Sequence, residues 1–244
     1  ESGDKTKVAS PFACWVTKWG EGKVPGWFDE HVFRCSAGLI FQKDPPSTSI
    51  RPTGVGFGGR RAYTKHMLDQ HMDAIRVATP SCQYGLDTKG TETIVHMVRD
   101  LLCQSDPHSD VVTSAPCHFQ ADETNAFNNC DRGIALRLAR IHWPEPLYKY
   151  VERLYATPNK IVLGEEVLWA ERGSTQGCGL GGALYNLTTA LPLIKAQEAI
   201  SQFNSASRHT SPCNCGAAAG YYDDCSTTAA LAPAYLAMST YIAE

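Results

Sequence analysis

Two aspartates stand side by side near the carboxyl end of the sequence, within Tyr221-Tyr222-Asp223-Asp224-Cys225. Adjacent carboxylates repel each other when they lose water, so one pKa would rise unless a cation compensates the charge. A hard ion that prefers oxygen ligands, such as Mg²⁺, does this and links carboxylates to substrate phosphates. Taken alone, the pair is more typical of a solvated turn, in which Asp is common.

A third acid, Asp122, is expected at the end of another strand, 101 residues before Asp223. If the strands that carry these acids are neighbours, Asp122, Asp223 and Asp224 converge on one edge of a sheet. That geometry suits two metal ions ~4 Å apart, which activate a hydroxyl and stabilise a leaving pyrophosphate oxygen. Phosphoryl transfer of this kind requires positioning and charge neutralisation rather than covalent chemistry.

The elements that would position these acids alternate irregularly between helices and strands, without an internal repeat. Short helical pieces are expected before residue 35, and a hairpin is expected from Leu39–Phe41 and Ile50–Pro52 around a polar turn. Apolar periodicity and proline stops predict the rest: helices over 60–77, 91–102, 132–142, 146–155 and 179–203, and strands over 118–122, 160–163, 167–171 and the approach to 222–224.

The composition is globular, since 43% of the 244 residues are hydrophobic and 19% are charged. Apolar runs fall short of the ~20 residues that a membrane span needs, and the start of the sequence has no apolar signal-peptide core. We therefore expect an intracellular protein that does not contact a membrane. Ten scattered cysteines favour reduced thiols over a disulfide framework, and the spacing of Cys213-Asn-Cys215 is tighter than zinc sites usually have.

Positive charge gathers between residues 43 and 65, although the net charge of −3 argues against indiscriminate nucleic-acid binding. This segment carries one acid, Asp44, against the five cations Lys43, Arg51, Arg60, Arg61 and Lys65. A phosphate-bearing partner would find a surplus of positive charge there; an ordinary solvated face is the alternative.

The glycines of Gly54-Val-Gly56-Phe-Gly58-Gly59 match the fingerprint of a dinucleotide-binding fold. That fold needs a buried strand before the glycines and an acid at the tip of the next strand, about 20 residues on. Here Pro52 interrupts the preceding strand, and Asp69 and Asp73 fall inside the following helix. The context excludes the dinucleotide interpretation.

Several motifs, in content and in order, resemble those of the reverse transcriptases of non-LTR retrotransposons. The resemblance covers about residues 36 to 228 and rests on Leu39-Ile40 with Lys43, Ile50-Arg51-Pro52, Arg60-Arg61, Gln83-Tyr84-Gly85, Gly90-Thr91-Glu92, Asp122-x-x-Asn125-Ala126-Phe127-Asn128, Arg132, Tyr155-Ala-Thr-Pro158, Gly173-x-x-Gln176-Gly177 and Tyr221-x-Asp223-Asp224. The chain departs from that family at Cys178-Gly179, where Asp-Pro is usual, which implies a more flexible loop.

The resemblance implies an α+β right-hand polymerase fold with fingers and palm subdomains and without a thumb. The expected parts are an N-terminal extension (1–35), fingers (36–116), the first catalytic strand of the palm (117–128), helices and a hairpin between palm segments (129–172), and a truncated palm with the Gln-Gly loop, a long helix and the Tyr-x-Asp-Asp strand (173–244).

The resemblance also implies the role of each candidate site residue. Asp122, Asp223 and Asp224 would be catalytic and would bind two Mg²⁺ ions, with Mn²⁺ as a substitute, and the carbonyl of Glu123 would lie beside the metal and the nucleotide. Phe127 would be a steric gate that collides with a ribose 2′-OH. Plain core packing is the alternative for such an aromatic residue.

The remaining implied roles concern the incoming dNTP. Gln176 and Gly177 would form the loop beside it, where a small residue lets the backbone approach closely. Lys43 and Arg51 would hold its triphosphate, Arg51 through its bidentate guanidinium. Arg60 and Arg61 are interpreted as solvated or in contact with template backbone rather than as catalytic.

The implied activity is that of an RNA-directed DNA polymerase, a nucleotidyltransferase that adds dNTPs to the 3′ end of a DNA primer on an RNA template, in the nucleus. Two alternatives stay open: a non-catalytic nucleic-acid-binding remnant of such an element, and an RNA-templated RNA polymerase, whose palm also carries an Asp-Asp pair.

Overall fold

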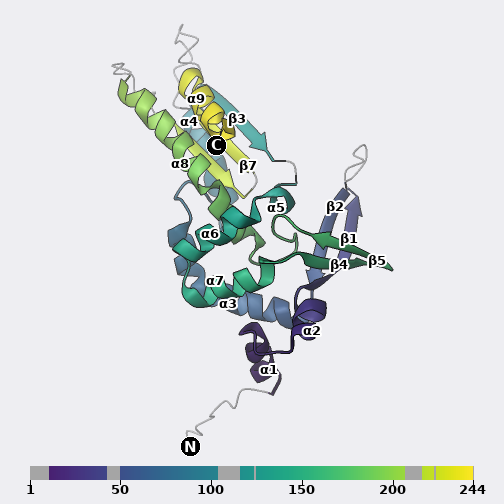
Figure 1. Ribbon diagram of the computed structural model, residues 1–244. Coiled ribbons are helices and arrows are strands. Elements are labelled where there is room, and N and C mark those ends of the chain that lie inside the picture. The colour runs from purple at the N-terminus through teal and green to yellow at the C-terminus, as the bar shows by residue number, and fades with distance from the viewer. Residues whose placement is uncertain are drawn as a thin grey trace, which may run out of the picture.

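The computed structural model describes residues 11–42, 50–103, 116–123, 125–206, 216–222 and 224–243. Helices and strands are mixed along these residues, as predicted (Figure 1). The described residues begin with helix α1 (Pro11–Gly20), the helical turn α2 (Gly26–Phe28) and a π-helical turn η1 (Asp29–Phe33). The short helical pieces expected before residue 35 are therefore confirmed for these residues.

A four-stranded sheet forms one end of the molecule, with the strand order β2-β1-β4-β5. Strands β1 (Cys35–Gln42) and β2 (Ile50–Gly56) pair antiparallel, and so do β4 (Asn159–Leu163) and β5 (Glu166–Ala170), which confirms both predicted hairpins. The two hairpins join through a parallel pairing of β1 with β4. Gly54 and Gly56 of the glycine motif lie within β2, which is antiparallel to its neighbour, so the motif does not follow the parallel strand that a dinucleotide fold requires.

The second sheet has three strands, in the order β3-β7-β6. Strands β3 (Pro116–Asp122) and β6 (Ala217–Tyr221) both pair antiparallel with the central strand β7 (Asp224–Ala230). From the sequence, the acidic pair was expected at the end of the approach strand, and no element was predicted after it. The structure adds strand β7 and the following helix α9 (Leu231–Ala243). Residues 225–229 are buried on both faces, so the alternation that marks a half-exposed strand is missing there.

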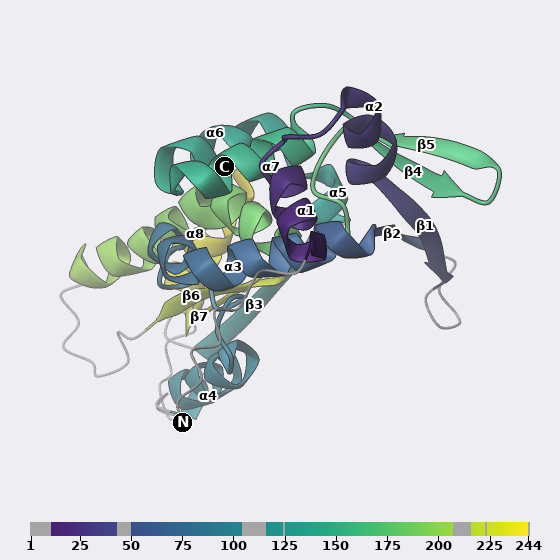
Figure 2. The ribbon, with the colours of Figure 1, turned by 90° about the horizontal axis from the view of Figure 1, so that it is seen from below.

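Helices cover both faces of the three-stranded sheet (Figures 1 and 2). The long helix α8 (Gly181–Ala206) and α9 pack against one face, and α4 (Gly90–Cys103) lies against the other. Small side chains such as Ala218 and Cys225 let α8 and α9 approach closely, and they share an apolar cluster with Leu193, Ile200 and Met238. The sheet is therefore held between helices, which fixes the position of its strand ends.

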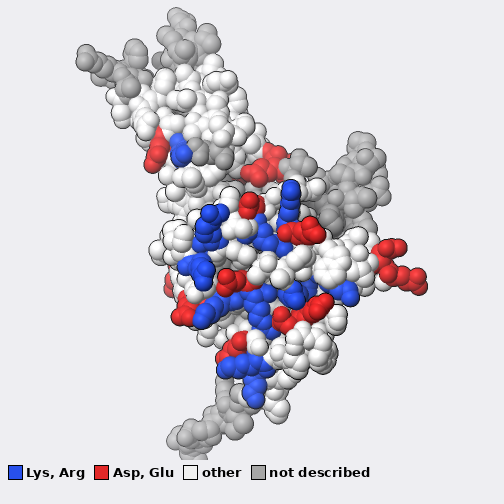
Figure 3. Space-filling model, in the orientation of Figure 1, with Lys and Arg blue, Asp and Glu red and all other residues white. Residues whose placement is uncertain are grey.

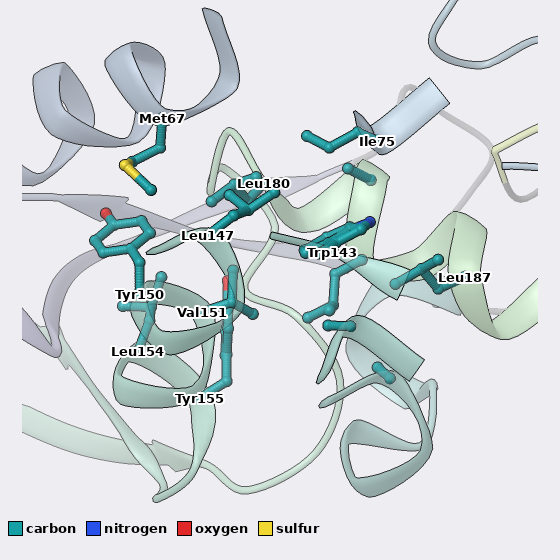
Figure 4. Packing of buried hydrophobic residues seen from close by; sticks show 14 of the residues in the cluster. Met67, Ile75, Trp143, Leu147, Tyr150, Val151, Leu154, Tyr155, Leu180 and Leu187 are labelled. Atoms are coloured by element: carbon teal, nitrogen blue, oxygen red, sulfur yellow. The ribbon is translucent and has the colours of Figure 1, made fainter. Parts of the chain in front are cut away.

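A second apolar core lies among α3 (Gly58–Ala78), α6 (Arg132–His142), α7 (Glu145–Tyr155) and the start of α8 (Figure 4). Helix α7 buries residues at helical spacing: Leu147, Tyr150, Val151, Leu154 and Tyr155. At the start of α6, the side chain of Asp131 accepts a hydrogen bond from the backbone N–H of Ile134 at 2.8 Å, an N-cap that sets where this helix begins. These helices match the predicted ranges.

The cysteines of the described ranges are free thiols, as expected. Burial raises the pKa of the Cys225 thiol to about 12. None of the helices in the described part of the chain combines the length and apolarity that crossing a bilayer requires.

Candidate functional site

Two of the three predicted acids face each other where two strands meet. Strand β3 ends at Asp122 and β7 begins at Asp224, and the two residues are register partners. Side chains of directly paired residues in an antiparallel sheet point to the same face and lie close together. Both residues are exposed, whereas Asp223 lies outside the described residues. The fold thus joins carboxylates that are 102 positions apart in the sequence.

The donor atoms of this pair suit a hard divalent cation, because carboxylate oxygens are the ligands that Mg²⁺ prefers. Among the described residues, no group of three or more His, Cys, Asp and Glu side chains is arranged to hold a metal ion. Of the three predicted metal ligands, the structure describes Asp122 and Asp224, and it places them as register partners. The carboxylate of Glu123 accepts a hydrogen bond from the Tyr241 hydroxyl at 2.7 Å and so is turned toward α9; its predicted role used only its carbonyl.

Phe127 lies beside the residue that precedes the acidic pair. It belongs to the short helix α5 (Ala126–Asn129), and its ring centroid is 6.0 Å from that of Tyr222 and 5.1 Å from that of Tyr185 in α8. Phe127 and Tyr222 are both half-buried. The ring of Phe127 is backed by aromatic side chains while part of it faces solvent, an arrangement that a steric gate and a peripheral core residue share.

The loop that carries Gln176 and Gly177 follows β5 in the chain and forms hydrogen bonds both to α5 and to the four-stranded sheet. At one end, the backbone N–H of Ser174 donates to the carbonyl of Phe127 at 2.6 Å; at the other, the N–H of Gly54 in β2 donates to the carbonyl of Gln176 at 2.8 Å. Gly177 has φ +103°, and a Cβ there would lie 2.8 Å from the carbonyl oxygen of Gly54. Glycine is required at this close approach.

Strand β2 also carries Arg51, which brings the backbone of this predicted triphosphate ligand to the sheet that contacts the loop. Of Arg51 only the backbone is described, and Lys43 lies outside the described residues. Beside the same loop, Arg61 and Lys65 of α3 line a groove of about 630 Å³ together with Gly177 and Cys178.

The interpretation of Arg60 as solvated or in contact with template was wrong. Its guanidinium is buried and donates to the carbonyl of Phe33 and to the hydroxyl of Ser36, each at 2.7 Å. Arg60 thus ties the first turn of α3 to the start of β1. The sequence pattern of two adjacent arginines could not tell which one faces the interior.

Arg132 has a structural role that the sequence reasoning missed. Its buried guanidinium donates to the carbonyls of Ala170, Arg172 and Gly173 at 3.0, 2.9 and 2.8 Å, and it lies 5.3 Å from the centre of the Tyr155 ring. Burial lowers the pKa of this guanidinium. The contacts hold the chain from the end of β5 to the loop before Gln176, and the only signal in the sequence was the place of Arg132 in the motif series.

A groove of about 580 Å³ lies next to Asp224, between α4 and the three-stranded sheet. Its walls are apolar on α4 and more polar on the sheet, with Ile94, Val98 and Leu102 facing Gln120, Tyr221 and Asp224. On the face of the molecule in Figure 3, the charged residues Lys, Arg, Asp and Glu lie intermixed over the middle of the molecule and are sparse over α8 and α9. Helix α9 contains no charged residue.

No protein-family model matches the chain, and no curated protein matches its sequence. Solved structures of telomerase, a reverse-transcriptase-related enzyme, do match its fold. The apo telomerase of Candida tropicalis, truncated from the C-terminal domain, has a TM-score of 0.55 at 11% identity, over 95% of this chain and 50% of that one. Telomerase of Candida albicans in complex with the TWJ fragment of telomeric RNA has a TM-score of 0.54 at 10% identity, over 96% and 44%.

At this identity the likeness shows the fold alone: the chain resembles the corresponding part of these telomerase structures in fold. The chain spans half or less of the length of these telomerase structures. The division into fingers and palm and the origin in a non-LTR element stay predictions.

Proposed function

We propose that this chain is the core of an RNA-directed DNA polymerase of a non-LTR retrotransposon, which extends a DNA primer with dNTPs on an RNA template. The observation that carries the proposal is the register pair of Asp122 and Asp224 at the edge of the three-stranded sheet. The reverse-transcriptase-like fold supports it. The Candida albicans telomerase structure holds a fragment of telomeric RNA, which supports an RNA partner for this chain.

In this proposal, Asp122, Asp223 and Asp224 hold two Mg²⁺ ions, which supply charge neutralisation for the attacking hydroxyl and the leaving pyrophosphate. Mn²⁺ serves as a substitute. The carboxylates need to stay ionised and correctly spaced, and a sheet edge packed between helices provides that rigidity. The protein contributes position and charge, and no covalent intermediate is required.

The other predicted residues act on the nucleotide. Phe127, held against Tyr222 and Tyr185, excludes the 2′-OH of a ribonucleotide by its bulk. Gln176 and Gly177 line the sugar and base, where the absence of a side chain at Gly177 allows close approach. Arg51, together with Lys43, binds the triphosphate, for which the planar guanidinium is suited.

Primer extension on poly(rA)/oligo(dT) with Mg²⁺ tests the proposal. We expect extension by the unmodified chain and a loss of at least a thousandfold in Asp122→Asn, Asp223→Asn and Asp224→Asn, because removal of a metal-binding charge removes transition-state stabilisation. Glu145→Gln is the matched control, since Glu145 is an exposed acid of α7 paired with Lys149, and it should retain full activity.

The outcomes separate the open alternatives. Retained extension in the three Asn variants overturns the assignment of the site. Nucleic-acid binding without extension by the unmodified chain favours a non-catalytic remnant. Preference for ribonucleotides over dNTPs favours an RNA-templated RNA polymerase, whereas a shift toward ribonucleotides only in Phe127→Val supports the steric gate.

A further inference from the structure

Gln83 lies against the edge of the three-stranded sheet, in the segment between α3 and α4. It is 4% exposed and forms a parallel bridge with Gly220 in β6. The backbone N–H of Tyr84 donates to the carbonyl of Gly220 at 2.7 Å, and the N–H of Gly220 donates to the carbonyl of Cys82 at 2.8 Å. These bonds fasten residues 82–84 to the strand that leads toward the acidic pair.

The carboxamide of Gln83 forms hydrogen bonds with both the backbone N–H and the backbone carbonyl of Tyr222. Its Oε1 accepts from the N–H of Tyr222 and from the N–H of Gly85, each at 3.0 Å, and its Nε2 donates to the carbonyl of Tyr222 at 3.3 Å. Two N–H donors converge on one end of the amide, which assigns its oxygen to that end. The residue that Gln83 binds, Tyr222, precedes Asp224 by two positions in the sequence.

Tyr222 needs an external hold because its backbone is left-handed, with φ +54°. This conformation is strained for a residue with a side chain, so it persists where surrounding contacts determine it. Bonds to both the N–H and the carbonyl of Tyr222 oppose rotation of the backbone away from this conformation.

The ring of Tyr222 lies in a cradle made by two glycines. A Cβ at Gly85 would come within 2.9 Å of the ring atom Cδ1, and a Cβ at Gly182 in α8 within 2.5 Å of Cε1. The same ring also lies near that of Phe127, with the two ring centroids 6.0 Å apart. The backbone conformation of Tyr222 therefore decides both where β7 begins and what backs Phe127.

We propose that Gln83 is a positioning residue of the polymerase site: through Tyr222 it holds Asp224 opposite Asp122 and holds the ring that supports Phe127. The inference rests on the proposed function. It makes metal affinity and sugar selectivity depend on a side chain that contacts neither metal nor nucleotide.

The test compares Gln83→Leu with Asn159→Leu. Asn159 is a matched control because it is also a buried carboxamide bonded to a backbone carbonyl, that of Leu154 at 2.8 Å, but in the four-stranded sheet. Two readouts are measured: Mn²⁺ affinity by electron paramagnetic resonance, which needs no turnover, and the ratio of kcat/KM for dNTP over ribonucleotide. We expect Gln83→Leu to weaken Mn²⁺ binding and lower the ratio, each about tenfold, and Asn159→Leu to lower only the Tm.

A double-variant cycle makes the test specific for backbone conformation. Glycine adopts positive φ without penalty, so in Tyr222→Gly the added Gln83→Leu change should leave Mn²⁺ affinity within twofold. Gln83→Glu keeps the two acceptor bonds and loses the donor, so an intermediate affinity is expected; this variant carries the test if Gln83→Leu does not fold.

The outcomes distinguish this inference from the proposed function. If Gln83→Leu lowers only the Tm, or if Asn159→Leu changes Mn²⁺ affinity equally, the positioning role is overturned. If the unmodified chain binds Mn²⁺ but does not extend primers, the proposed function fails while the Mn²⁺ arm still decides the role of Gln83. If it binds no Mn²⁺, both are overturned.

Discussion

The two sheets of this molecule are stabilised in different ways. The three-stranded sheet lies between helices, and its central strand β7 is buried from Cys225 to Ala229. The four-stranded sheet ends in an open strand, β5, where Val167, Leu168 and Trp169 are 43, 51 and 53% exposed. Burial holds the first sheet, whereas pairing between its own strands and bonds at its base hold the second.

Buried arginines make those bonds at the base. Arg60 is tied to the start of β1 and Arg132 to the end of β5, each through neutral carbonyl or hydroxyl oxygens. A buried cation is tolerated when its donors are satisfied. The acids predicted to bind metal thus belong to the sheet that is packed between helices, whereas the predicted nucleotide-binding elements lie on or beside the more exposed sheet.

Loss of Arg132 should break this arrangement with the largest effect. In Arg132→Met, the carbonyls of Ala170, Arg172 and Gly173 lose their buried donor, so we expect the free energy of unfolding to fall by about 3 kcal/mol or more. Urea denaturation measures it. Arg137→Met, an exposed change in the same helix, should cost under about 0.5 kcal/mol. Equal losses in both variants would contradict the role of Arg132.

The free energy of unfolding at alkaline pH should depend on Cys225, which is buried in β7 of the three-stranded sheet. Its pKa is raised to about 12 from an ordinary 9.0 because the thiol is buried, so the unfolded chain releases this proton first as the pH rises. The contribution is fully present below pH 9 and is lost toward pH 12, by about 1.4 kcal/mol at pH 10. Unfolding free energies from pH 7 to 10 should fall less steeply in Cys225→Ala. Identical slopes in the unmodified protein and in Cys225→Ala would refute the prediction.

The open strand should give the smallest effect. Trp169→Thr keeps β propensity and removes an exposed ring, so the Tm should change by no more than a degree or two. Phe119→Thr in β3 removes a ring packed against the buried cluster of the other sheet and should cost about 2–3 kcal/mol. A large loss in Trp169→Thr would mean that the four-stranded sheet is held by more than strand pairing.

Local structure was predictable where one face of an element is buried. Helix α7 shows the apolar spacing that its buried face requires, and proline stops at residues 144 and 158 bound it. Strand β7 was missed because it is buried on both faces, which leaves no alternation to detect. Helix α9 was missed because apolar residues such as Leu236 and Ile242 lie on its exposed face as well as on its buried one, which hides the helical period. Arg60 was misjudged because a charged side chain is expected to be exposed. Its burial depends on hydrogen bonds to Phe33 and Ser36, which the sequence pattern does not reveal.

By itself the sequence determined which chemical groups are present: carboxylates at Asp122 and Asp224, an aromatic ring at Phe127, and glycines where backbones must approach. Only the tertiary structure decided that Asp122 and Asp224 are register partners and that Gln83 grips Tyr222. These contacts join residues more than a hundred positions apart. Their register depends on how helices bury the two faces of a sheet, which no local pattern specifies.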